Sequence, residues 1–290
     1  MFENAQSAKE RTVSKDLPNI GDVETTVIDG LQIRVARTGA RTGMPVLLTS
    51  PWPESLYAFR DVTTDLGKHS PLVLVDLPGF GRSEGRADLF SPERMGHFIG
   101  KIADHFGLER LHAIGPDIGT STLLFAALCR PALFESIVVG SGATSPDLAA
   151  SHLTDLIASP AGAFAAIDGG DFAAGFVSQA AMRGIPSGVL EDYRLSSSGR
   201  RFDEAANFVR TYPRELPRLR TLLPTLETPV LIIAGKHDPL VPPPNGQLLA
   251  DHLPRNRYTL LEGGHAIWED APEDYARAVG SWLEGDYRSA

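Results

Sequence analysis

Short runs of β-branched and aliphatic residues alternate with longer helical segments, and this alternation constrains the fold more than any other feature of the chain. The pair Asp29-Gly30 is typical of a tight turn, and it predicts a hairpin from the runs on either side. Strands that alternate with helices predict a mostly parallel sheet covered on both faces. The predicted strands are 23–28, 31–36, 46–49, 72–76, 111–114, 136–139, 230–234 and 258–261, and the predicted helices are 91–106, 120–127 and 273–283.

The pattern changes after Gly142. Segment 145–226 contains no clear strand, is rich in Ala, Gly and Arg, and has short amphipathic pieces at 190–193 and 204–212. We therefore expect a helical cap over 145–226, inserted into a core formed by 21–144 and 227–290. Residues 1–20 are expected to form an N-terminal arm, which either stays loosely held or packs on a second copy in a homodimer.

Composition narrows the classes of function. The chain has 290 residues, 42% of them hydrophobic, and a formal net charge of −9, which argues against nucleic acid as a partner. No apolar run is long enough to cross a bilayer, and the N-terminus lacks the apolar stretch of a secretion signal. The single cysteine, Cys129, excludes an internal disulfide, is expected to be buried in a helix, and fits a cytoplasmic protein.

The pentapeptide 115–119, Gly-Pro-Asp-Ile-Gly, falls between the strand predicted at 111–114 and the helix predicted at 120–127. Small residues two positions to each side of Asp117 suit the sharp strand-to-helix turn that presents a nucleophile. The helix N-terminus behind such a turn favours an anion. The alternative is that Asp117 only caps the helix.

Two further segments supply partners for this nucleophile. Asp238 follows the strand at 230–234, and His265 follows the strand at 258–261. Each residue alone also suits a turn or a helix cap, and the neighbouring His237 suits an exposed position. The order nucleophile, acid, histidine favours a hydrolytic site in which His265 is the base and Asp238 orients it.

The loop that follows the strand at 46–49 contains Trp52 between two prolines. In sites of this kind that loop donates one backbone N–H to an oxyanion, and the residue after the nucleophile donates the other. The predicted donors are Trp52 and Ile118. Trp52 would also place its indole at the pocket, whereas the alternative is a core tryptophan, and both can hold.

These segments resemble the epoxide hydrolase and haloalkane dehalogenase branch of the α/β-hydrolase superfamily. The loop 50–55, Ser-Pro-Trp-Pro-Glu-Ser, is similar to the branch's H-G-x-P-E-S, and 76–83 is similar to its D-x-x-G-x-G-x-S. Segments 263–265 and 268–272 resemble its histidine segment. The likeness covers nearly the whole chain outside the cap and the first twenty residues. It implies an α/β-hydrolase fold with a mostly parallel, eight-stranded sheet flanked by helices and an inserted helical cap.

The chain also departs from the branch. Pro116 stands where a histidine is usual, and Ile118 stands where halide-binding dehalogenases often have tryptophan and fluoroacetate dehalogenases have arginine. The resemblance implies cap tyrosines that protonate an opening epoxide. Tyr193 and Tyr212 are the candidates, although neither matches the branch's motif, and the alternative is that both are packing residues.

Carboxylate chemistry limits the reaction. Asp117 is expected to be ionised at neutral pH, and it suits displacement at an sp3 carbon better than attack on an acyl group. The favoured function is a cofactor-independent, epoxide hydrolase-like enzyme that forms an aspartyl ester with a small, mainly apolar substrate and hydrolyses it with water. The alternatives are a haloalkane dehalogenase-like enzyme using the Trp52 N–H for the halide, and a non-catalytic small-molecule-binding homologue. Segment 79–84 lacks the third glycine of a dinucleotide fingerprint, and we expect no cofactor and no metal.

Overall fold

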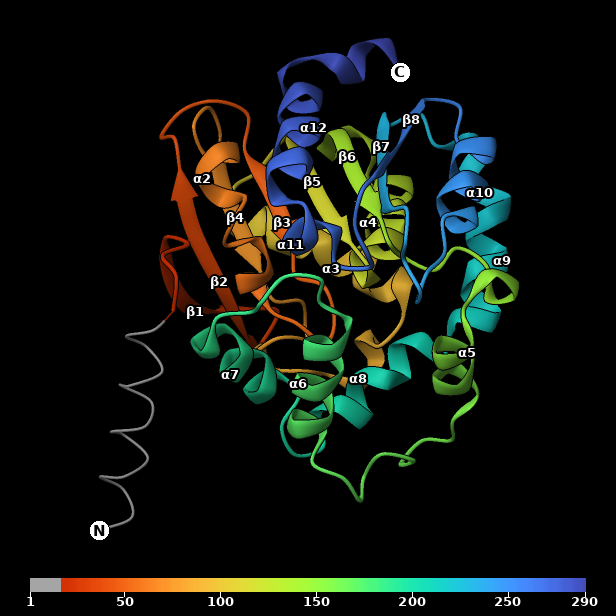
Figure 1. The fold of residues 1–290 in the computed structure, drawn as a ribbon. Coiled ribbons are helices and arrows are strands. Elements are labelled where there is room, and N and C mark those ends of the chain that lie inside the picture. Colours follow the sequence, from red (N-terminus) through yellow and green to blue (C-terminus); the bar gives the residue numbers. More distant parts are fainter. Residues whose placement is uncertain (1–16) are drawn as a thin grey trace.

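Eight strands form one sheet at the centre of the computed structural model, which describes residues 17–290 (Figure 1). Their order is β1-β2-β4-β3-β5-β6-β7-β8; β2 pairs antiparallel with β1 and β4, and every other pair is parallel. The predicted mostly parallel, eight-stranded α/β architecture is confirmed. The strands are β1 (Asp22–Ile28), β2 (Leu31–Gly39), β3 (Val46–Thr49), β4 (Pro71–Val75), β5 (Leu111–Pro116), β6 (Phe134–Gly140), β7 (Val230–Gly235) and β8 (Asn256–Leu261).

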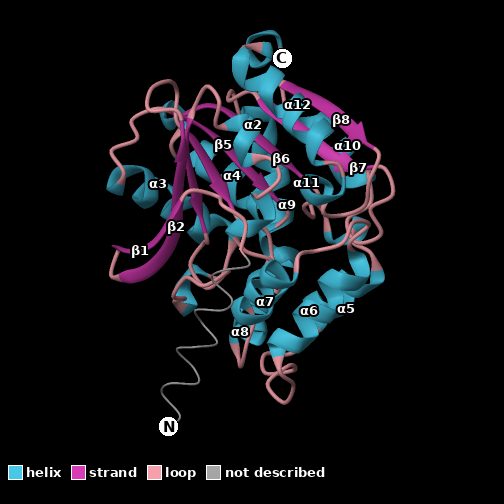
Figure 2. Ribbon diagram, turned by 60° about the vertical axis from the view of Figure 1, so that its left-hand side comes forward, coloured by secondary structure: helices cyan, strands magenta, loops and turns pink. Residues whose placement is uncertain are grey.

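Helices cover both faces of the sheet because successive strand residues point to opposite sides. In β3, Leu47 belongs to the hydrophobic cluster that includes residues of α3 and α4, whereas Val46 and Leu48 belong to the cluster that includes residues of α12. Figure 2 shows the twisted sheet with helices on either side. The core helices are α2 (Thr63–Leu66), α3 (Pro92–His105), α4 (Ile118–Cys129), α10 (Pro244–His252), α11 (Ile267–Asp270) and α12 (Pro272–Glu284), with short 3-10 turns at Leu56–Phe59, Ala87–Leu89, Pro131–Leu133 and Asp286–Ser289.

Between β6 and β7 the chain forms only helices; α5 to α8 lie below the sheet in Figure 1, and α9 lies at its side next to α10. They are α5 (Ser151–Ala158), α6 (Gly169–Ala180), α7 (Ser187–Ser196), α8 (Arg201–Val209) and α9 (Tyr212–Leu222), with 3-10 turns at Pro146–Leu148 and Leu223–Thr225. The piece predicted at 204–212 is divided, because α8 ends at Val209 and α9 begins at Tyr212.

A buried ionic network joins these helices to the core. Asp192 of α7 accepts hydrogen bonds from both terminal nitrogens of Arg34 at 2.8 and 2.9 Å and from the Ser55 hydroxyl at 2.6 Å. Nε of Arg34 donates to Asp76 at 2.6 Å. Because Asp192 and Asp76 are fully buried, losing Arg34 would leave two carboxylates in the interior without their arginine partner.

Two further predictions concern Cys129 and the N-terminal arm. Cys129 is exposed at the last position of α4, so the expectation that it is buried is wrong; the helix turns this position outward. Most of the predicted arm, residues 1–16, lies outside the described residues. Ile20, at its end, is 2% exposed and packs in the core. None of the described helices is long and apolar enough to span a bilayer.

Candidate active site

Asp117 lies at the turn between β5 and α4, with a φ of 54° and a ψ of −120°. This conformation costs a residue other than glycine roughly 1–3 kcal/mol, so the surroundings must hold it. A Cβ at Gly115 or Gly119 would lie 2.7 or 2.6 Å from Oγ1 of Thr49, and a Cβ at Gly142 would lie 2.4 Å from the Asp117 carbonyl oxygen. Small residues are therefore required around the turn.

The two predicted partners of Asp117 lie beside it. Nδ1 of His265 is 2.9 Å from Oδ2 of Asp238, and Nε2 is 3.8 Å from Oδ1 of Asp117. The other oxygen of Asp238 accepts backbone N–H bonds from Leu240 and Val241 at 2.8 and 2.9 Å. Asp238 is thus fixed by backbone donors, and it holds the imidazole with its second nitrogen toward Asp117.

The pKa values of Asp117 and His265 are both shifted upward at this site. Burial raises the pKa of Asp117 to about 6, although His265 and the backbone N–H groups of Trp52 and Ile118 act to lower it. The Trp52 N–H donates to Oδ2 of Asp117 at 2.7 Å. Burial lowers the pKa of His265, but the opposing effect of Asp238 and Asp117 is larger, and the net shift is upward. The structure thus brings Trp52 and Ile118, both predicted as oxyanion donors, to the carboxylate.

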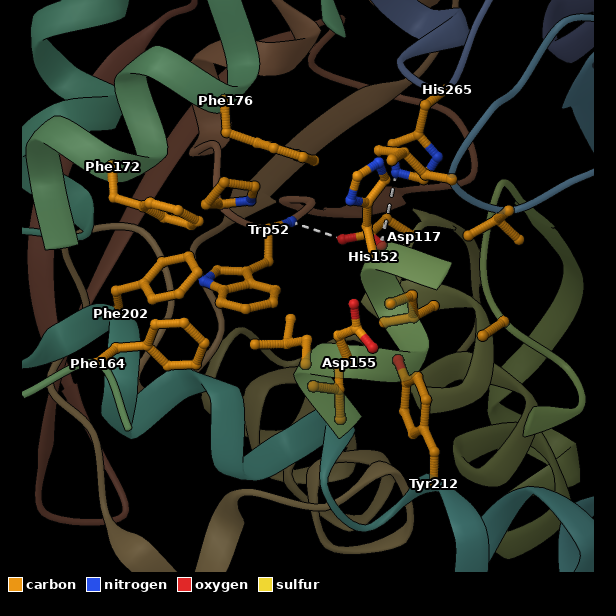
Figure 3. A pocket seen from close by; sticks show the side chains of 17 residues that line it. Trp52, Asp117, His152, Asp155, Phe164, Phe172, Phe176, Phe202, Tyr212 and His265 are labelled. Atoms are coloured by element: carbon orange, nitrogen blue, oxygen red, sulfur yellow. Dashed lines mark hydrogen bonds and ion pairs between the residues drawn. The ribbon is translucent and has the colours of Figure 1, made fainter. Parts of the chain in front are cut away.

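A cavity of about 300 Å³ opens in front of Asp117, and residues of α5, α6, α8 and α9 line it. One side is an aromatic wall formed by Trp52, Phe164, Phe172 and Phe202 (Figure 3). Trp52 stacks on Phe202 with ring centroids 4.9 Å apart, and Phe164 and Phe172 contact Phe202 edge-on. A cavity of this size and lining suits a small, largely apolar molecule.

The two predicted cap tyrosines lie in different environments. Tyr212 lines the cavity, and Figure 3 shows its hydroxyl directed toward Asp117. Burial and the charge of Asp117 raise the pKa of Tyr212, so the hydroxyl stays a neutral donor. Tyr193 does not line the cavity. It is fully buried, and its hydroxyl donates to Glu269 at 2.8 Å, because α7 turns it toward the core.

Two polar residues that line the cavity were not predicted from the sequence. His152 and Asp155 lie three residues apart on α5, so both face the cavity. Figure 3 shows the His152 imidazole beside Asp117 and His265, and the Asp155 carboxylate between Trp52 and Tyr212. Their spacing indicates a shared helix face, but nothing local indicates what that face meets. Among residues 17–290, no group of three or more His, Cys, Asp or Glu side chains is arranged to hold a metal.

The fold and this arrangement of residues are those of an α/β hydrolase. The chain belongs to the family described as alpha/beta hydrolase fold, whose pattern matches residues 45–272. The predicted membership of this superfamily is therefore confirmed.

Relatives with several activities match most of the chain. RutD, a candidate carbamate hydrolase from Caulobacter sp. strain K31, is 27% identical over 277 residues, which cover 91% of this chain and 99% of that protein. Haloalkane dehalogenase 2 from Mycobacterium tuberculosis strain H37Rv is 26% identical over 279 residues, covering 90% and 96%. The solved structure of epoxide hydrolase CorEH has a TM-score of 0.75 at 18% identity, covering 89% of this chain and 96% of that one. At that identity the structural likeness shows the fold alone.

Proposed function

We propose that the chain is an epoxide hydrolase-like enzyme that acts through a covalent ester on Asp117. The observation that carries the proposal is the set of donors around the space in front of this carboxylate. Tyr212 and His152 both line that space, and each can give a proton to an oxygen that leaves carbon (Figure 3).

In the first step, an oxygen of Asp117 attacks an epoxide carbon and the C–O bond of the ring breaks. The released oxygen takes a proton from the Tyr212 hydroxyl or the His152 imidazole, which leaves a hydroxyalkyl ester on Asp117. Backbone N–H donors do not block this attack, because the Trp52 N–H binds Oδ2 while Oδ1 faces His265.

In the second step, water attacks the carboxyl carbon of the ester while His265 takes its proton. The N–H groups of Trp52 and Ile118 hold the oxyanion that forms, and Asp238 stabilises the imidazolium. Collapse of this intermediate releases the diol and restores the Asp117 carboxylate, and the proton held by His265 returns to the donor that lost one in the first step. The balance is one epoxide and one water consumed for one diol.

Carbon–halogen hydrolysis is the second candidate, and it is favoured by the likeness to haloalkane dehalogenase 2. A leaving halide needs N–H donors that are free. Figure 3 shows the indole nitrogen of Trp52 on the side of the ring turned away from Asp117, and Ile118 offers no side-chain donor. The positions of these two residues therefore favour an oxygen leaving group over a halide.

Mass spectrometry of a His265→Gln variant tests the mechanism, because the ester should form and then persist. After incubation with styrene oxide, we expect the Asp117 peptide to gain the full mass of the epoxide. A bromoalkane would instead add only its alkyl group and release bromide. His237→Gln, which changes an exposed histidine, should turn over without accumulating ester.

Adding Asp117→Asn to His265→Gln should abolish the adduct. A folded His265→Gln protein that forms no adduct with epoxides or haloalkanes contradicts the ester mechanism. In that case a non-catalytic binding function becomes the better account, and Asp117→Asn should then leave ligand affinity nearly unchanged.

A further inference from the structure

Asp155 places a solvent-exposed carboxylate on the lining of a largely apolar cavity. It faces a cavity that has an aromatic wall on one side and apolar residues over most of the remainder (Figure 3). Among the described residues, none makes a hydrogen bond or an ion pair with the side chain of Asp155 or of His152. The proposed mechanism assigns protons to His152 and Tyr212 and gives Asp155 no task.

A carboxylate in such a cavity discriminates between ligands by charge. It attracts a cation and repels an anion. The aromatic wall adds to the attraction, because ring faces bind ammonium groups as well as apolar groups. A second carboxylate, Asp117, lines the same cavity and acts in the same direction.

We propose that this cavity selects substrates that carry a protonated amine, with the amine held by Asp155 and the apolar remainder held by the aromatic wall. The inference rests on the proposed function, since it names the substrate class of the same site. An amino-substituted epoxide with an aryl or alkyl group fits the description. Carboxylate-bearing substrates are disfavoured.

The expected effect is moderate, because Asp155 lines the cavity and is exposed to solvent. Water and salt screen a pair in this position, and exposed ion pairs contribute up to about 1 kcal/mol, which corresponds to roughly fivefold in affinity. An effect of this size is measurable when a charged and a neutral ligand of the same shape are compared.

Binding of benzylammonium and of its neutral isostere, benzyl alcohol, tests the proposal by calorimetry at neutral pH and low salt. We expect the wild-type protein to bind benzylammonium more tightly. Asp155→Asn should weaken benzylammonium binding about fivefold and leave benzyl alcohol binding unchanged. Asp171→Asn removes an equal charge from an exposed position on α6 outside the cavity lining, and it should change neither.

Equal binding of the two probes by the wild-type protein would overturn the inference, as would failure to bind benzylammonium. Equal effects of Asp155→Asn and Asp171→Asn would overturn it too, because they would indicate net charge alone. Neither probe has a reactive carbon, so these outcomes are independent of ester formation. The proposed function is tested separately, by the adduct that neutral styrene oxide forms with the His265→Gln variant.

Discussion

Replacing Asp117 by asparagine is expected to stabilise the folded protein above pH 6, because the turn holds a carboxylate where burial disfavours its charge. The pKa of Asp117 rises from 3.8 to about 6 on folding. Between these values the folded state keeps a proton that the unfolded chain has lost, so stability falls as pH rises through this window. Each pKa unit corresponds to about 1.4 kcal/mol, which gives a cost of about 3 kcal/mol above pH 6.

Asparagine retains the shape and an oxygen that can accept the Trp52 N–H, but it has no charge to bury. We expect Asp117→Asn to be more stable than the wild type by up to about 3 kcal/mol at pH 8, with the difference vanishing below about pH 4. Urea unfolding of both proteins between pH 4 and 8 measures it. A difference that does not change with pH, or a less stable variant at pH 8, would refute the reasoning.

Three further predictions address the same turn and the cap. The rate at which styrene oxide alkylates Asp117 in a His265→Gln background should fall about tenfold per pH unit below pH 6, measured by mass spectrometry, because only the carboxylate attacks; a flat profile would contradict this. Arg34→Ala should lower the free energy of unfolding by about 3–5 kcal/mol in urea titrations, because it leaves the buried carboxylates of Asp192 and Asp76 without their arginine partner. Gly142→Ala should cost roughly 1–3 kcal/mol and slow alkylation, whereas Gly175→Ala, where the added Cβ meets nothing within 4 Å, should not destabilise.

The strands and the turn at Asp117 could be predicted because their signals are local. Asp29 and Gly30 both adopt positive φ, at 51° and 81°, which is the conformation that this dipeptide favours in two-residue hairpins. The glycines around Asp117 are required by contacts with Thr49, and the spacing of those glycines is visible in five consecutive residues. Ser91 likewise caps the start of α3 close to the predicted position, with its hydroxyl accepting the Arg94 N–H.

The cavity could not be predicted to the same depth, because its walls come from segments distant in sequence. His152 and Asp155 share a face of α5, but only tertiary packing decides that this face meets Asp117. The same applies to the cap tyrosines. Tyr212 reaches the cavity and Tyr193 reaches Glu269, although nothing in their neighbouring residues distinguishes them.

A buried carboxyl pair behind the site illustrates how distant residues set the chemistry of a local motif. Glu54 accepts the Trp268 indole N–H at 3.0 Å, and burial together with the charge of Glu269 raises the pKa of Glu54 well above its usual range. Arg60 pairs with Glu269, so one arginine compensates one of the two carboxylates while the other favours its neutral acid form. A charged Glu54 would oppose ionisation of nearby Asp117. The proton that Glu269 helps to keep on Glu54 therefore favours the charged form of Asp117, although the two glutamates are far apart in the sequence.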